Sequence, residues 1–198
     1  MTKKMRIIGF QGVNASGKST LSHRLSADYI EYDTVATDNL LAINRMLNPN
    51  DIRLSGSSYS SWERFGEPTR ENIWRSLCEY REANRPYLDC ILRRARDQRV
   101  GIIIEGLHIE PELFYSYYNE LNINIFMLKI EDEVRHIERI KQKCDYRPEL
   151  LDRLTKYFPH IRTVQNLLIE EARQYHIKII ETGISIEESL REIKDSLI

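Results

Sequence analysis

The sequence predicts an α/β fold, a three-layer sandwich with a five-stranded parallel sheet between two layers of helices. Short apolar runs rich in β-branched residues alternate along the chain with segments of helical periodicity. The runs are nearly continuous in their apolar character, which is typical of strands that helices cover on both faces. The 198 residues contain no low-complexity linker, internal repeat or long block of like charge. We therefore expect a single domain over residues 1–198.

Each expected element follows from its local pattern. The five strands are expected at residues 6–10, 32–36, 100–104, 123–130 and 177–180. Helical faces are formed by Leu21 and Leu25, by Val134, Ile137 and Ile140, by Ile161, Val164 and Leu168, and by Ile186, Leu190, Ile193 and Leu197. Ser185 and Glu188 have the spacing of a capping box at the start of the last of these helices. The segment 40–99 is expected to be mostly helical or irregular.

The composition excludes several classes of function. No apolar run approaches the ~18 residues of a membrane span, so no membrane contact is expected. The net charge of −1 provides no basic field for nucleic acid. Three scattered cysteines without metal-ligand spacing indicate reduced thiols and a cytoplasmic protein. The excess of arginine over lysine favours an anionic ligand, because the guanidinium fork matches phosphate and carboxylate.

One motif between the first expected strand and the first expected helix predicts a nucleotide site. It fits G-x-x-x-x-G-K-[ST] in full and consists of Gly12, Val13, Asn14, Ala15, Ser16, Gly17, Lys18, Ser19 and Thr20. Its glycines let the backbone curl so that N–H groups point at phosphate oxygens, and the next helix presents its positive end. We therefore expect a P-loop that binds ATP, with Lys18 at the β- and γ-phosphates. A chance match in a turn before an amphipathic helix is the alternative.

An acidic residue at the end of the third expected strand completes a magnesium site. Glu105 follows three isoleucines and precedes Gly106, so it stands where a buried strand emerges. Because Mg²⁺ prefers oxygen ligands, we expect Ser19 and Glu105 to hold it. A solvent-exposed glutamate at a strand end is the alternative.

Asp38 is the candidate acid on the acceptor side. It follows Thr37 and the second expected strand, where small P-loop kinases place a carboxylate that faces the acceptor hydroxyl. There it could accept the proton or orient the nucleophile. Aspartate is also a favoured N-cap, so Asp38 could instead cap a helix that begins at Asn39. The two roles are compatible.

A charged helix downstream has the pattern of a lid. Arg135, Arg139 and Lys143 recur every four residues and therefore line one helix face, and Arg147 follows after a short polar segment. In kinases of this type such a lid closes over the transferring phosphoryl group and excludes water. Arg139 and Arg147 are accordingly expected to act in catalysis. A solvated charged face is the alternative for each residue.

Two further residues are expected near the site. His108 lies three residues after Glu105 and is a candidate for binding the substrate, although a lone histidine is more often structural. Gly183 follows the last expected strand, where this fold passes the adenine ring, and glycine allows backbone to approach a ligand.

Several segments, spread over most of the chain, match one family. They are Gly12–Thr20, Thr37-Asp38 with Arg45, Ser57-Ser58-Tyr59 with Trp62, Arg94-Ala95, Ile104–His108 with Pro111, and Tyr157-Phe158 with Ile161-Arg162 and Gln165. In these segments the chain resembles the archaeal-type 2-phosphoglycerate kinases. The resemblance implies transfer of the γ-phosphoryl of ATP, with Mg²⁺, to 2-phosphoglycerate or a related small phosphorylated acid. It also implies that Arg45, Ser57, Ser58, Tyr59 and Arg162 bind this anionic substrate.

The departures from that family lie mainly on the acceptor side. Members tend to have arginine where this chain has Leu41, the segment 80–84 is altered, and fuller members carry an extra N-terminal region. Two other functions stay open: a nucleoside, polynucleotide or sugar kinase, and a switch protein that binds ATP without phosphorylating a metabolite. A homodimer is also left open.

Overall fold

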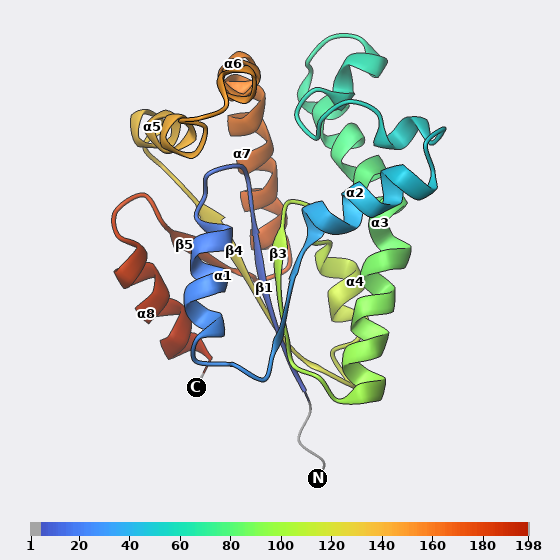
Figure 1. Ribbon diagram of the computed structural model, residues 1–198, viewed down its shortest axis with the longest axis vertical. Helices are drawn as coiled ribbons and strands as arrows, with labels where there is room; N and C mark the ends of the chain where they lie inside the picture. Colours follow the sequence, from blue (N-terminus) through green and yellow to red (C-terminus); the bar gives the residue numbers. More distant parts are fainter. Residues whose placement is uncertain (1–4, 198) are drawn as a thin grey trace.

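The computed structural model describes residues 5–197 and confirms the predicted α/β fold (Figure 1). Five strands form one sheet in the order β2-β3-β1-β4-β5, and each neighbouring pair is parallel. The strands are β1 (Arg6–Gly12), β2 (Asp33–Ala36), β3 (Ile102–Gly106), β4 (Asn122–Lys129) and β5 (Lys178–Glu181). Each coincides with a predicted apolar run, with boundaries displaced by a residue or two.

Helices cover both faces of the sheet. The helices of the described residues are α1 (Lys18–Ser26), α2 (Thr37–Leu47), α3 (Arg70–Gln98), α4 (Pro111–Tyr115), α5 (Glu133–Lys143), α6 (Pro148–Lys156), α7 (Phe158–Gln174) and α8 (Ile186–Ser196), with short 3₁₀ helices η1 (Ile52–Leu54) and η2 (Ser61–Phe65). Figure 1 shows α1 and α8 against one face, and α3, α4 and α7 against the other. The predicted cap of α8 is present, since the Ser185 side chain accepts a hydrogen bond from the Glu188 N–H at 3.2 Å.

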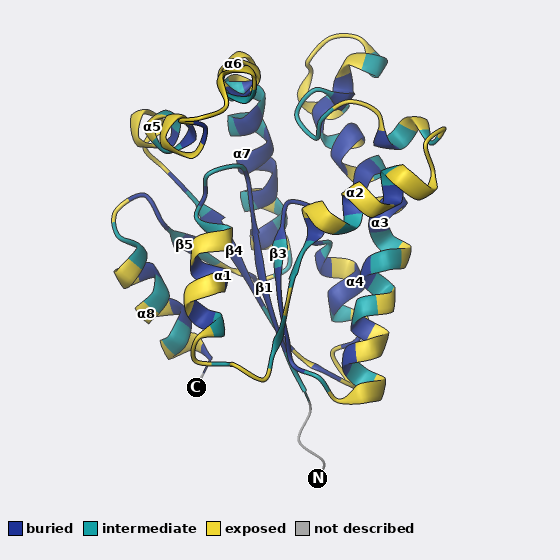
Figure 2. Cartoon of the chain, viewed as in Figure 1, coloured by how far each residue is buried: buried dark blue, intermediate teal, exposed yellow. Residues whose placement is uncertain are grey.

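Alternate strand residues belong to two separate cores. Ile102 and Ile104 of β3 pack in the core beneath α3, α4 and α7, whereas Ile103 packs with Leu21 and Leu25 of α1. All three isoleucines are buried, and Figure 2 shows the middle strands of the sheet largely in dark blue, the colour of buried residues. Burying a side chain of this size contributes about 1.5–3 kcal/mol, so a strand covered on both faces gains from every position. This is why the strands lack the polar alternation of a half-exposed sheet.

The parallel arrangement brings the functional candidates to one edge of the sheet. The phosphate-binding loop follows β1, Glu105 lies at the end of β3, and Asp38 follows β2. Because the carboxyl ends of parallel strands meet at the same edge, segments far apart in sequence converge there. Figure 1 shows α5 and α6 beyond one side of this edge, and α2 with the two 3₁₀ helices beyond the other.

The prediction that Val134, Ile137 and Ile140 form the buried face of α5 is partly wrong. Ile140 is buried, but Val134 is 65% exposed, and the other buried side chain of the helix is His136. α5 lies at the rim of the domain and not over the sheet, so only one side of it is covered.

Within residues 5–197, no helix is both long and apolar enough to span a membrane. All three cysteines, Cys78, Cys90 and Cys144, are free thiols.

Candidate active site

The phosphate-binding loop joins β1 to α1 and follows the curl that its motif predicts. Gly12 has no room for a side chain, since a Cβ atom there would lie 2.6 Å from Ser16 Oγ. Ala15 and Gly17 adopt left-handed backbone angles, with φ of 62° and 91°. Such residues turn neighbouring N–H groups toward one point and form a concavity that suits an anion. Thr182 donates its hydroxyl to the Ser16 carbonyl at 2.8 Å and ties the loop to the segment after β5.

Lys18 lies inside this curl. Its ammonium Nζ donates a hydrogen bond to the Val13 carbonyl oxygen at 2.8 Å. Burial lowers the pKa of Lys18, while the negative charge of Glu105 opposes this shift. The first N–H groups of α1 have no intrahelical acceptor. The loop therefore presents a lysine, free helix N–H groups and the positive end of α1 to the same space.

Ser19 and Glu105 meet as the sequence predicts. The Ser19 hydroxyl donates to the Glu105 carboxylate Oε1 at 2.8 Å, although the residues are 86 positions apart in sequence. A hydroxyl and a carboxylate oxygen are the ligand types that Mg²⁺ takes, usually completed by waters and substrate phosphates. Within residues 5–197, no three His, Cys, Asp or Glu side chains cluster as a metal site. The pair therefore suits a magnesium ion that shares its coordination with a bound phosphate.

Gly106 supports this corner of the site. A Cβ atom at Gly106 would overlap the side chain of Thr37, so only glycine lets β3 end beside the start of α2. This close approach fixes the distance between the Glu105 strand and the helix that carries Asp38.

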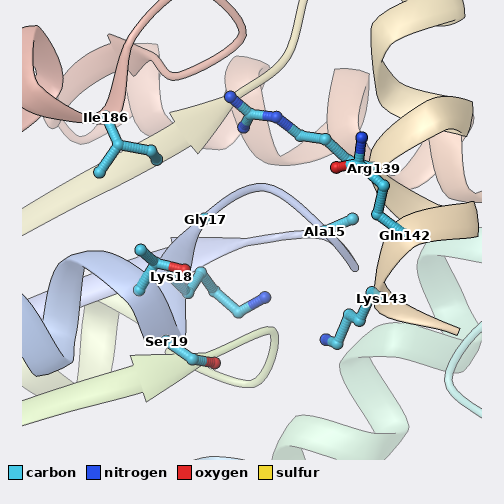
Figure 3. A pocket seen from close by; sticks show the side chains of 9 residues that line it. Ala15, Gly17, Lys18, Ser19, Arg139, Gln142, Lys143 and Ile186 are labelled. Carbon is cyan, nitrogen blue, oxygen red and sulfur yellow. The ribbon is translucent and has the colours of Figure 1, made fainter. Parts of the chain in front are cut away.

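Two cavities share Lys18 and Ser19 in their lining. The first, of about 440 Å³, is lined by Ala15, Gly17, Lys18, Ser19, Thr20, Arg139, Gln142, Lys143 and Ile186. Figure 3 shows Arg139, Gln142 and Lys143 of α5 across this space from the phosphate-binding loop. The second, of about 330 Å³, is lined by Lys18, Ser19, Glu105 and Asp38, together with residues from α2, the loop before η2, α5 and α6. Lys18, Ser19 and Lys143 border both cavities.

Asp38 lines the second cavity, and its side chain does not cap the N-terminus of α2. α2 begins at Thr37, its N-cap is Ala36, and no side chain caps its first turn. The alternative of an Asp38 cap for a helix beginning at Asn39 is therefore wrong. The Asp38 carboxylate is exposed and lines the cavity. Among the described residues it has no hydrogen-bond or ion-pair partner, so both of its oxygens are available to a ligand.

The loop before η2 forms another wall of the second cavity. Its serines and Tyr59 line the space, but they also hold one another and their neighbours. Ser57 Oγ lies 2.9 Å from Ser60 Oγ, and Ser58 Oγ lies 3.1 Å from His108 Nε2. The Tyr59 hydroxyl oxygen accepts a hydrogen bond from the Asn14 backbone N–H at 2.8 Å. The acceptor-side loop is thus fastened directly to the phosphate-binding loop.

His108 lies behind this wall and does not line the cavity. It is buried and stacks on Tyr80, with ring centroids 5.8 Å apart. Burial lowers the pKa of His108 to about 4, so the ring is neutral at physiological pH. Its predicted contact with substrate is replaced here by contacts with Ser58 and, at 3.4 Å, with Thr37.

Arg45 lines the second cavity, but two of its three guanidinium nitrogens donate hydrogen bonds within the protein. It donates to the carbonyl oxygens of Leu54 at 3.0 Å and Gly56 at 2.6 Å. It also donates to the Tyr80 hydroxyl at 2.8 Å, and that hydroxyl in turn donates within the same loop. Arg45 and Tyr80 therefore shape the acceptor-side loop. The altered segment 80–84 of the sequence begins with this anchor.

The structure brings some predicted lid residues to the nucleotide side. Arg139 lines the first cavity and donates to the Thr182 carbonyl oxygen. Arg135 donates to the Gly183 carbonyl oxygen at 2.9 Å. Helix α5 is thus held against the segment after β5, next to the predicted adenine position. Arg147 lies farther out, exposed, where it donates to the Lys143 carbonyl oxygen at 3.1 Å and lines neither cavity.

Arg162 is not brought to the predicted substrate side. It donates to the carbonyl oxygens of Ile130 at 2.6 Å and Glu131 at 2.8 Å. It borders a separate surface pocket, outside both cavities described above. A buried histidine lies beside it, with His136 Nδ1 3.4 Å from Arg162. In this position Arg162 braces the segment between β4 and α5.

Sequence reasoning missed two residues at the site, Arg153 and His136. Arg153 lines the second cavity together with Lys143, which was predicted only as part of the charged face of the lid. His136 Nε2 lies 2.8 Å from the Asn14 carbonyl oxygen. Because a carbonyl oxygen only accepts, Nε2 carries the proton of a neutral His136 ring, which agrees with a pKa lowered by burial. A usable signal was present for His136, since it is spaced four residues from the buried Ile140.

Solved structures of kinases share this fold. A gluconokinase from Sinorhizobium meliloti has the same fold, with a TM-score of 0.53 at 15% identity over 98% of this chain and 93% of that chain. No protein-family model matches the sequence.

In sequence the chain resembles the archaeal 2-phosphoglycerate kinases. It is 25% identical to that of Methanopyrus kandleri over 193 residues, which cover 94% of this chain and 59% of the relative. It is 23% identical to a mevalonate-3-phosphate 5-kinase from Thermoplasma acidophilum over 179 residues, which cover 89% of this chain and 88% of the relative. The chain thus spans about three fifths of the first relative and most of the second.

Proposed function

We propose that the protein is a kinase that transfers the γ-phosphoryl group of ATP to a hydroxyl of a small phosphorylated acid, as a single domain over residues 1–198. One observation carries the proposal: Lys18, Ser19, Glu105 and Asp38 line a single cavity. Phosphoryl transfer needs donor-phosphate contacts, a metal-side acid and an acceptor-side acid around one reacting atom. These four residues supply all three.

On the donor side, the curled backbone of residues 12–20 and Lys18 would hold the β- and γ-phosphates. Lys18 would exchange its hydrogen bond with the Val13 carbonyl for one with a phosphate oxygen. Ser19 and Glu105 would hold Mg²⁺, which neutralises phosphate charge when it is bound. Gly183 borders the proposed adenine position, where Arg135 already holds its carbonyl oxygen.

On the acceptor side, Asp38 would orient the substrate hydroxyl and take its proton. The hydroxyl oxygen forms a bond to the γ-phosphorus as the bond from that phosphorus to the bridging oxygen of ADP breaks. The proton passes to the Asp38 carboxylate, whose oxygens have no partner among residues 5–197. Positioning of this kind, with fixed charges around the transferring group, accounts for most of the catalysis expected of such a site.

Arg139 and Lys143 would stabilise the transferring charge from the lid side, since both border the first cavity beside the phosphate-binding loop. Arg147 would join them only if the segment between α5 and α6 moved inward, because it is exposed and bonded to the Lys143 carbonyl. Ser57, Ser58 and Tyr59 would form the wall against which the acceptor lies. We keep Arg45 as a substrate contact through its remaining guanidinium nitrogen, but do not keep Arg162 or His108.

The acceptor class rests on the names of the relatives. Those of Methanopyrus kandleri and Thermoplasma acidophilum act, by their names, on 2-phosphoglycerate and on mevalonate 3-phosphate, which are both phosphorylated hydroxy acids. The basic residues of the second cavity suit such an anion. Because ATP and these acids are soluble metabolites, we propose the cytoplasm as the compartment.

The proposal is tested with purified protein, ATP, Mg²⁺ and a panel of acceptors. The panel contains phosphorylated hydroxy acids, nucleosides and sugars, and the measurements are ADP release and product mass. We expect product from at least one phosphorylated acid and none from the Lys18→Met variant. Phosphorylation of nucleosides or sugars alone would replace the acceptor class. ATP hydrolysis that no acceptor stimulates would favour a switch protein instead.

A further inference from the structure

One arginine of the second cavity is left without a partner by the fold. Arg153 lies on α6 and lines this space of about 330 Å³. Its exposed side chain has no hydrogen-bond or ion-pair partner within residues 5–197. Arg45 lines the same space, but two of its guanidinium nitrogens donate to backbone carbonyl oxygens. Arg153 therefore presents a complete guanidinium fork to an anion in the cavity, whereas Arg45 presents one nitrogen.

Helix α6 is held in place on the acceptor side, one turn after Arg153. The Tyr157 hydroxyl donates to the Glu63 carboxylate Oε1 of η2 at 2.6 Å, and Tyr157 also lines the second cavity. The Tyr157 N–H donates to the Arg153 carbonyl oxygen at 3.1 Å, which places the two residues on successive turns. Leu154, 4% exposed, packs in the core beneath α7. A positioned helix thus carries Arg153 at the wall of this cavity.

The other cation without a partner, Lys143, lies at the boundary with the nucleotide side. Lys143 lines both cavities, whereas Arg153 lines only the second. Figure 3 shows the ends of the Lys18 and Lys143 side chains at the same gap. Burial lowers the pKa of Lys18, and the positive charge of Lys143 lowers it further. Two lysines that repel each other across a gap suit the transferring phosphoryl group, which leaves Arg153 for the acceptor itself.

We propose that Arg153 binds the anionic group of the acceptor and thereby selects a hydroxy compound that carries a phosphate or a carboxylate. The acceptor hydroxyl lies at Asp38 of α2 and its anion at Arg153 of α6, and both residues line the one cavity. This inference rests on the proposed kinase function and assigns the choice of acceptor to one residue within it. A neutral acceptor would gain nothing from Arg153.

Three forms of one acceptor distinguish phosphate from carboxylate at this position. They are the phosphorylated hydroxy acid that gives the most product, its dephosphorylated form and its carboxamide. Arg153→Gln should lower kcat/KM for the first form about tenfold or more, because hydrogen bonds to a charged group are lost. The form that lacks the anion bound by Arg153 should be nearly insensitive to the substitution. A form that is not phosphorylated is measured by its inhibition constant against the first.

The substitution should act on acceptor binding alone. Arg153→Gln should raise the KM for the acceptor by the same factor and leave the KM for ATP unchanged, because Arg153 lies outside the first cavity. Arg153→Lys keeps the charge but loses the fork, so it should recover part of the acceptor affinity. Lys143→Gln should instead lower kcat, by about a hundredfold, because Lys143 faces the transferring group.

Lys141→Gln is the matched control for the loss of one positive charge. Lys141 is exposed on α5 and lines neither cavity, so this variant should have the kinetics of the wild type. Arg153 is also exposed and without a side-chain partner, so its variants should unfold at the Tm of the wild type. Thermal unfolding of each variant therefore separates lost binding from lost folding.

The outcomes separate this inference from the function on which it rests. An unchanged acceptor KM in Arg153→Gln, a raised KM for ATP, or the same loss for all three forms would overturn the inference and leave the kinase standing. Product from neutral acceptors alone would do the same. Failure to phosphorylate any compound of the panel would overturn both.

Discussion

Replacing Tyr59 with phenylalanine would remove the hydrogen bond that joins the loop before η2 to the phosphate-binding loop. The Tyr59 hydroxyl accepts a hydrogen bond from the Asn14 N–H at 2.8 Å. Its carbonyl accepts another from Trp62 Nε1 at 2.8 Å, which fixes the backbone. Burial raises the pKa of Tyr59, so the hydroxyl stays protonated throughout the working pH range. Phenylalanine keeps the ring and removes the oxygen alone.

The expected cost follows from the state of the Asn14 N–H after the substitution. A polar group left without a partner in a partly buried position costs about 1–2 kcal/mol. For a chain of this size each 1 kcal/mol lowers Tm by about 2–4 °C, so we expect a decrease of about 2–8 °C. Because Asn14 belongs to the phosphate-binding loop, part of this loss should also appear as weaker ATP binding. We expect a KM for ATP raised by about fivefold, which corresponds to about 1 kcal/mol.

The assay combines urea unfolding, thermal unfolding with and without a non-hydrolysable ATP analogue, and steady-state kinetics. Tyr146→Phe is the matched control, since Tyr146 is 94% exposed and should unfold and bind as the wild type does. A Tyr59→Phe variant within about 0.5 kcal/mol of the wild type, the range of ordinary surface substitutions, with an unchanged KM for ATP, would refute the reasoning. The two loops would then be energetically independent.

Four other predictions concern single groups. Lys18→Met should lower kcat by about a thousandfold or more, as a kinetic assay measures. The midpoint of urea unfolding should change little, because burial already disfavours the charged lysine in the folded protein. Glu105→Gln should raise the Mg²⁺ concentration that gives half-maximal activity, and an unchanged magnesium titration would remove Glu105 from the metal site. Asp38→Asn should lower kcat by about 10²–10⁴-fold with the KM for ATP unchanged; equal loss in both would point to a structural role. His108 has its pKa lowered to about 4 in the folded protein and an ordinary value near 6.5 when unfolded, so the unfolded chain binds more protons between these pH values. Stability should therefore be complete above about pH 6.5 and fall by up to about 3 kcal/mol as the pH decreases to 4; urea unfolding against pH should show a shallower fall in His108→Asn.

The fold and the donor side could be predicted because their signals are local or follow from the sheet. Three isoleucines before Glu105 indicate a strand covered on both faces, and a parallel sheet brings its end to the end of β1. The hydrogen bond between Ser19 and Glu105 follows from this topology alone. Nothing comparable fixes the second cavity, since most of its lining residues come from helices and loops outside the sheet.

The arginines show why the acceptor side could not be predicted in the same way. Arg45 and Arg162 both match segments of related kinases, yet Arg45 mainly holds the loop before η2 and Arg162 holds the segment after β4. A guanidinium can donate to backbone carbonyl oxygens as well as to a ligand phosphate, and the sequence does not tell which of them it meets. Arg153, which carries no motif, is the arginine that the fold leaves free in the cavity.

Asn14 explains how the separate parts of the site act on the phosphate-binding loop. Its N–H donates to Tyr59 of the acceptor-side loop, and its carbonyl accepts from His136 of α5. The next residue, Ala15, has a φ of 62°, a conformation that costs a non-glycine residue about 1–2 kcal/mol. Two hydrogen bonds of about 1 kcal/mol each are enough to offset that cost. The shape of the loop that receives phosphate therefore depends on contacts from both the acceptor side and the lid, and a change in either should alter ATP binding without touching the nucleotide.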